Sequence, residues 1–175
     1  SLFMTTDRIA KKLDLSSINK SHHIRVPAPR LDGSLHKLIA PLNAMGSFHS
    51  CLKHYARFKP DIVVGLGGYG CAVPVMAAKA TNIPVMLFES NAIPGKTVSW
   101  LSHFADSVQL QWSEAKDGLA CPRLVVTGNP IRKQLLQGNP GAAAQKFGLD
   151  PNRTTLLAMG GSQGALSLNN KLVET

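Results

Sequence analysis

The sequence contains few cysteines, few aromatic residues and no long hydrophobic run. Its three cysteines, Cys51, Cys71 and Cys121, are far apart and form no C-x-x-C pair, so neither a disulfide framework nor a zinc site is expected. No apolar run reaches the roughly 18 residues that a membrane-spanning helix needs, and no signal peptide opens the chain. These absences favour a globular protein of a reducing cytosol.

Acidic residues are also scarce, with 10 Asp and Glu against 19 Lys and Arg, which gives a formal net charge of +9. Such a charge favours nucleic acid, an anionic membrane surface or phosphorylated ligands as partners. Only 6% of the residues are aromatic, and no basic cluster with interleaved aromatics is present. Nucleic acid is therefore not an expected partner, and phosphorylated ligands and an acidic membrane remain.

What the chain does contain is an alternation of short apolar strands and amphipathic helices, with 44% hydrophobic residues and 15 glycines. This alternation predicts an α/β fold of Rossmann-like parallel sheets. Strands are expected at residues 23–26, 61–65, 83–88, 107–111, 124–127 and 154–159, and helices at 7–13, 35–55, 72–80, 94–104, 132–136, 142–147 and from 166 onward. Pro41 should kink the long helix or mark its first turn.

A stretch rich in Gly, Pro, Asn and Gln at residues 128–152 is the expected linker between two domains. It predicts a first domain at residues 1–130 and the start of a second at residues 131–175. The first residues read like the end of a strand, and the last ones stop inside a helical pattern. We therefore expect a fragment of a longer protein.

Three predicted strands end in loops that lead into helices, at residues 65–70, 128–132 and 160–165. Glycine lets the backbone approach a phosphate, and a helix N-terminus offers free N–H groups. The first loop, in DIVVGLGGYG, reads G-x-G-x-x-G and is followed at the end of the next strand by Glu89. That spacing is typical of dinucleotide sites, so an NAD-dependent oxidoreductase is one hypothesis. Yet the fingerprint normally belongs to the first βαβ unit, and some 60 residues precede it here.

Four segments, in this order, resemble the MurG family: KPDIVVGLGGYG, IPVMLFESNAIPGK, VVTGNPIRKQLL and LLAMGGSQGALSLN. Members of this family transfer N-acetylglucosamine from UDP-N-acetylglucosamine to undecaprenyl-pyrophosphoryl-MurNAc-pentapeptide in peptidoglycan synthesis, at the cytoplasmic face of the bacterial membrane. The resemblance implies a two-domain GT-B glycosyltransferase with a nearly complete N-terminal domain, which takes the lipid-linked acceptor, and a truncated donor-binding domain. On this hypothesis the glycine loop faces a lipid pyrophosphate rather than NAD.

The resemblance also implies roles for individual residues. Asn91, Arg132 and Ser162 would bind UDP-N-acetylglucosamine, and the loop of Gly67, Gly68 and Tyr69 would face the acceptor pyrophosphate. The catalytic base is expected upstream of Ser1, with Glu89 as a candidate inside the chain that could equally be a buried or capping carboxylate. No cofactor and no metal are implied, because no carboxylate cluster is present to hold an ion.

Two further interpretations stay open. The chain could be a non-catalytic remnant that binds membranes. The long helix also carries an apolar stripe with basic neighbours, and it predicts shallow insertion of residues 38–48 into an anionic bilayer, although the stripe could instead pack wholly into the core. The stripe consists of Leu38, Leu42, Met45 and Phe48, with Lys37, Lys53, Arg57 and Lys59 nearby.

Overall fold

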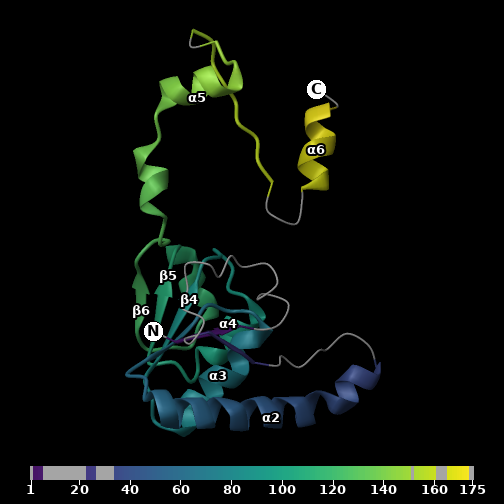
Figure 1. The fold of residues 1–175 in the computed structure, drawn as a ribbon, viewed down its shortest axis with the longest axis vertical. Helices are drawn as coiled ribbons and strands as arrows, with labels where there is room; N and C mark the ends of the chain where they lie inside the picture. Colours follow the sequence, from purple (N-terminus) through teal and green to yellow (C-terminus); the bar gives the residue numbers. More distant parts are fainter. Residues whose placement is uncertain (1, 6–22, 27–33, 151, 161–164, 174–175) are drawn as a thin grey trace. The chain divides into compact units, whose positions relative to one another are not determined.

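The computed structural model describes residues 2–5, 23–26, 34–150, 152–160 and 165–173 (Figure 1). The chain divides into two compact units, Ser1–Pro130 and Ile131–Thr175. The helix predicted at residues 7–13 lies outside the described residues. The ligand-binding role that the sequence suggests for each unit remains a prediction.

The first unit is built on a parallel sheet of four strands in the order β3-β4-β5-β6. A separate parallel pair is formed by β1 and β2. Every described strand pairing is parallel, which confirms the predicted α/β class. The strands are β1 (Phe3–Thr5), β2 (His23–Arg25), β3 (Val63–Gly65), β4 (Val85–Glu89), β5 (Ser107–Leu110) and β6 (Leu124–Val126).

Helices follow the strands, as βαβ connections require. In the first unit they are α2 (Ser34–Phe58), α3 (Tyr69–Ala80) and α4 (Lys96–Leu101), together with the 3₁₀ helix η2 (Ser113–Gly118). The helix α3 packs on β3 and β4, and α2 lies beside α3 (Figure 1). The prediction that Pro41 could mark the first turn of the long helix is wrong, because α2 begins at Ser34.

The core of this unit lies between the sheet and the helices α2, α3 and α4. Along β4, the side chains of Val85, Leu87 and Glu89 are buried while the two between them are partly buried, the period of two expected of a strand. A polar contact joins the two longest helices of the unit: the Tyr55 hydroxyl on α2 donates to the Pro74 carbonyl oxygen on α3 at 3.0 Å. The hydrophobic core includes Val75, Ala77, Ala78, Leu87, Leu101, Val108 and Leu110.

The second unit contains short helices: the 3₁₀ helix η3 (Lys133–Gln137), α5 (Pro140–Phe147) and α6 (Leu166–Val173). The sequence explains the bounds of α5. Its first turn carries Pro140, the Asn139 side chain accepts from the Ala142 N–H at 3.0 Å, and Gly148 ends it at φ 64°. These are the proline, polar cap and left-handed glycine that favour helix ends.

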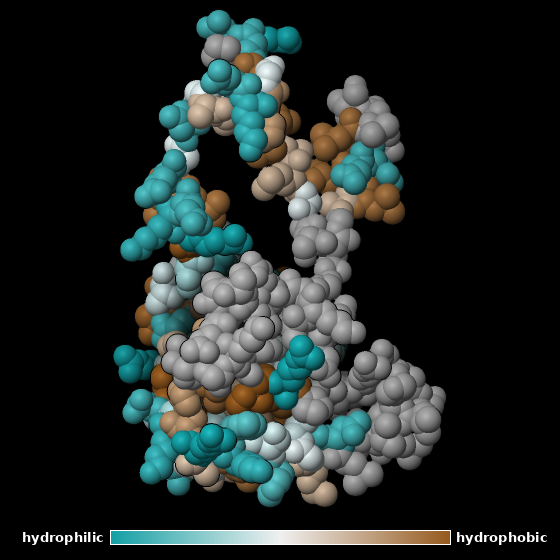
Figure 2. Space-filling model, viewed as in Figure 1, coloured by the Kyte–Doolittle hydropathy of each residue, from teal (hydrophilic) through white to brown (hydrophobic). Residues whose placement is uncertain are grey.

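The strand predicted at residues 154–159 is wrong, because this segment is irregular in the structure. A β-strand is stabilised by hydrogen bonds to a neighbouring strand, and the described residues of Ile131–Thr175 form no strand that could pair with it. Leu156 is accordingly 85% exposed, and Leu157 and Met159 are exposed as well. Figure 2 shows hydrophobic residues at the surface of this unit.

Candidate functional site

A pocket of about 280 Å³ lies where β3 and β4 end, at the carboxyl edge of the first unit's sheet. This is the edge at which open parallel sheets bind ligands. The two loops that follow these strands supply its walls, together with the first turn of α4. Its lining includes Gly67, Gly68, Tyr69, Glu89, Asn91 and Lys96.

The glycine loop forms one wall of the pocket, and its turn requires glycine at two positions. Gly67 and Gly68 adopt φ values of +81° and +72°, a left-handed conformation that side chains with a Cβ disfavour. This turn takes the chain from β3 into α3, which begins at Tyr69. Gly68 has no side chain to cap the helix. The N–H of Cys71 donates to the Gly68 carbonyl oxygen at 3.2 Å, so the N–H groups of Tyr69 and Gly70 are the ones that ligand or solvent oxygens can meet.

Gly65 has a packing role instead of a binding role. A Cβ at this position would lie 2.8 Å from Cδ2 of Leu87 and 3.2 Å from Cγ2 of Val75. Only glycine therefore allows β3 to pass this close to the core. The first glycine of the G-x-G-x-x-G pattern is explained without a dinucleotide.

Glu89 forms the centre of the second wall. Its side chain is only 3% exposed. Its Oε1 accepts from the backbone N–H of Asn91 at 2.9 Å and from Nδ2 of Asn91 at 2.7 Å, and its Oε2 accepts from the N–H of Gly95 at 2.8 Å. Both oxygens are thus engaged within the loop, which favours the capping role for Glu89 over that of a base. The NAD hypothesis requires Glu89 to bind a ribose, and the same contacts leave it poorly placed to do so.

Lys96 is a pocket residue that the sequence interpretation missed. It is exposed in the first turn of α4, beside the Glu89-bound N–H of Gly95. A mobile cation at the pocket wall suits a phosphorylated ligand. The signal that could have identified it is a lysine placed directly after the turn that joins a strand end to the next helix.

The structure groups five of the predicted site residues around this pocket: Gly67, Gly68, Tyr69, Glu89 and Asn91. Arg132 belongs to the second unit, where it is exposed and directly precedes η3. Ser162 lies outside the described residues. The roles of Arg132 and Ser162 therefore remain predictions.

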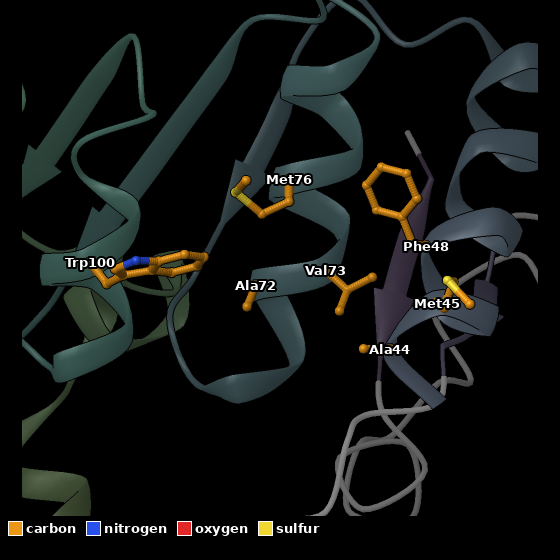
Figure 3. A pocket seen from close by; sticks show the side chains of 7 residues that line it. All are labelled: Ala44, Met45, Phe48, Ala72, Val73, Met76 and Trp100. Carbon is orange, nitrogen blue, oxygen red and sulfur yellow. The ribbon is translucent and has the colours of Figure 1, made fainter. Parts of the chain in front are cut away.

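A second hollow, a shallow apolar groove of about 290 Å³, lies over α3 between α2 and α4. Figure 3 shows Met45 and Phe48 of α2 on one side, Val73 and Met76 on α3, and Trp100 of α4 on the other side. Met45 is 67% exposed and Trp100 is half-exposed. This agrees with partial exposure of the predicted stripe, whereas the side chains of Leu38 and Leu42 lie outside the part described.

Within the described ranges, no three or more His, Cys, Asp and Glu side chains gather where they could hold a metal ion. No helix of the described part is both long enough and apolar enough to cross a bilayer.

Residues 1–110 match the family model of the glycosyltransferase family 28 N-terminal domain. The chain belongs to glycosyltransferase family 28. A curated relative from Lacticaseibacillus casei is 41% identical over 129 residues, which cover 74% of this chain and 36% of the relative. One from Bacillus pumilus is 38% identical over 123 residues, covering 70% of this chain and 34% of the relative. Both are named UDP-N-acetylglucosamine–N-acetylmuramyl-(pentapeptide) pyrophosphoryl-undecaprenol N-acetylglucosamine transferase.

The fold of this chain is also similar to that of a solved structure. The crystal structure of Acinetobacter baumannii MurG superposes with a TM-score of 0.59 at 24% identity, covering 79% of this chain and 40% of that one. These matches confirm the predicted family and fold class. The matched region spans about a third of the length of the curated relatives.

Proposed function

We propose that the complete reading frame carrying this chain transfers N-acetylglucosamine from UDP-N-acetylglucosamine to undecaprenyl-pyrophosphoryl-MurNAc-pentapeptide. The observation that carries the proposal is the pocket at the carboxyl ends of β3 and β4, in a chain 41% identical to a relative named for this reaction. The pocket combines uncapped N–H groups at the start of α3 with the cation of Lys96. Both suit a pyrophosphate.

Within this proposal the unit Ser1–Pro130 takes the lipid-linked acceptor, and Ile131–Thr175 begins the donor-binding domain. Asn91 contacts the donor sugar, while Arg132 and Ser162 contact the diphosphate of UDP. Glu89 is not assigned as the base that removes the acceptor proton, because both of its oxygens are already engaged, and the family resemblance implies a base upstream of Ser1. Catalysis then consists of positioning the acceptor hydroxyl and stabilising the departing UDP by fixed donors and a cation.

Calorimetric titration of the complete reading frame with UDP-N-acetylglucosamine and, separately, with NAD tests the proposal. We expect heat of binding with the UDP-sugar and none with NAD, because the oxygens of Glu89 that a ribose would need already accept hydrogen bonds from its own loop. Tight binding of NAD without a response to the UDP-sugar would overturn the proposal in favour of an oxidoreductase. Membrane binding without a response to either ligand would favour the non-catalytic remnant.

We also propose that the protein works at the cytoplasmic face of the membrane as a peripheral protein and that the apolar groove meets the bilayer. The groove exposes Met45 and Trp100, and Lys53, Arg57 and Lys59, on α2 and directly after it, are exposed. An acceptor with a polyprenyl tail has to be reached at the bilayer surface. Each cation near an anionic leaflet adds roughly 1 kcal/mol of attraction, which salt weakens.

Co-sedimentation with vesicles measures this binding. We expect the protein to bind vesicles containing anionic lipid, to release them at high salt, and to bind them less when Met45→Asp places a charge in the groove. Met159→Asp is the matched control, because Met159 is also exposed but lies in the other unit. Equal binding to neutral vesicles, binding to neither, or equal losses in both variants would contradict a bilayer contact at the groove.

A further inference from the structure

The contacts of Glu89 determine more than the shape of a loop. All three of its partners are hydrogen-bond donors: the backbone N–H groups of Asn91 and Gly95 and the side-chain Nδ2 of Asn91. A carboxylate in this setting acts only as an acceptor. The side-chain amide of Asn91 must therefore turn its NH₂ group, and not its carbonyl oxygen, toward Glu89.

This constraint fixes the orientation of an amide that is otherwise symmetric in shape. The two ends of an asparagine amide are assigned from the hydrogen bonds around them, and here the carboxylate admits one assignment. Asn91 is exposed and lines the pocket, while its Nδ2 is held at 2.7 Å from Oε1 of Glu89. Its carbonyl oxygen, Oδ1, therefore points away from Glu89 and stays available to a ligand, together with the second N–H of Nδ2.

We propose that Glu89 is a positioning residue that makes Asn91 present a hydrogen-bond acceptor to the pocket. The ligand group that meets Oδ1 of Asn91 must then be a donor. If the proposed function holds, on which this choice of ligand rests, the donor is a hydroxyl or the acetamido N–H of the sugar. Through the N–H of Gly95, Glu89 also holds the start of α4, and with it Lys96, against the same loop.

We therefore expect that exchanging the carboxylate and the amide between positions 89 and 91 is tolerated better than changing either residue alone. In Glu89→Gln one acceptor oxygen is lost, and an NH₂ group faces the N–H of Asn91 or of Gly95. In Asn91→Asp two carboxylates face each other at hydrogen-bond distance, which is repulsive. The double variant keeps the net charge, restores a hydrogen bond between positions 89 and 91, and again leaves an acceptor oxygen for the pocket.

Turnover of UDP-N-acetylglucosamine by the complete reading frame tests this exchange. We expect each single variant to lower kcat/KM by about tenfold or more, and the double variant to recover at least part of that loss, since residues in contact are coupled. Thermal unfolding of each variant separates loss of fold from loss of positioning. Additive losses in the double variant, or an unchanged kcat/KM in Glu89→Gln, would overturn the proposal.

A second measurement on the chain itself does not depend on turnover. In isotope-labelled protein, the side-chain amide protons of Asn91 should exchange slowly with solvent and shift as hydrogen-bonded protons do. In Glu89→Ala, which removes both acceptor oxygens, both features should be lost, while the amide of Asn82, exposed in the same unit, stays unchanged. If the wild-type protein turns over no UDP-sugar, the proposed function fails, and these resonances still decide the role of Glu89. Unaltered Asn91 resonances in Glu89→Ala would overturn it.

Discussion

Replacing Leu87 with alanine will lower the free energy of unfolding of the first unit by about 2–5 kcal/mol, the usual range for a buried leucine. Leu87 is 0% exposed at the middle of β4, which pairs with β3 on one side and with β5 on the other. Its Cδ2 fills the space that Gly65 leaves open, 2.8 Å from where a Cβ would stand. The truncation leaves a cavity between two adjacent strands, β3 and β4.

Chemical denaturation of the chain, followed by circular dichroism, measures this loss. Leu66→Ala is the matched control, because Leu66 belongs to the same unit and is 75% exposed. It should change the free energy of unfolding by no more than about 0.5 kcal/mol. Equal effects of the two substitutions would show that β4 does not lie at the centre of the core.

The central strand also shows why much of the fold could be predicted from the sequence. β4 combines branched and aromatic residues with a period of two, and it follows the alanine-rich helix α3. Local propensity and burial agree at such positions, so the order of strands and α-helices from residue 61 to residue 127 agrees with the prediction, whereas the 3₁₀ helix η2 was expected to be an irregular connection. The prediction failed at residues 154–159, where a similar apolar run has no pairing strand among the described residues.

The candidate site was predictable in its residues but not in their contacts. Glycines after a strand identified the loop of Gly67 and Gly68, and the family resemblance identified Asn91. Spacing alone, however, made Glu89 look like a ribose ligand. The structure shows instead that its two oxygens accept hydrogen bonds from three N–H groups of its own loop. Such contacts could not be predicted from the sequence, because the path of a loop depends on hydrogen bonds between residues that have no periodic pattern.

Replacing Arg132 with alanine should cost the complete enzyme about 2–4 kcal/mol of transition-state stabilisation, a decrease of roughly 30- to 1,000-fold in kcat/KM. The reason is chemical. Under the proposed function, the departing UDP gains negative charge, and a guanidinium with its fork of donors is the side chain best suited to meet a diphosphate. Arg132 is exposed and directly precedes η3, so its side chain is not needed for the core and the fold should survive.

Steady-state kinetics with UDP-N-acetylglucosamine and a lipid-linked acceptor measures this loss, and thermal unfolding verifies the fold. Arg153→Ala is the matched control, because Arg153 is an exposed arginine of the same unit and its removal changes the net charge equally. Arg132→Lys separates charge from geometry: a lysine keeps the cation but loses the bidentate contact, so it should restore only part of the activity. If Arg132→Ala turns over substrate as fast as Arg153→Ala, Arg132 does not contact the diphosphate. Another cation must then meet the departing UDP, and Lys96 at the pocket wall is the first candidate.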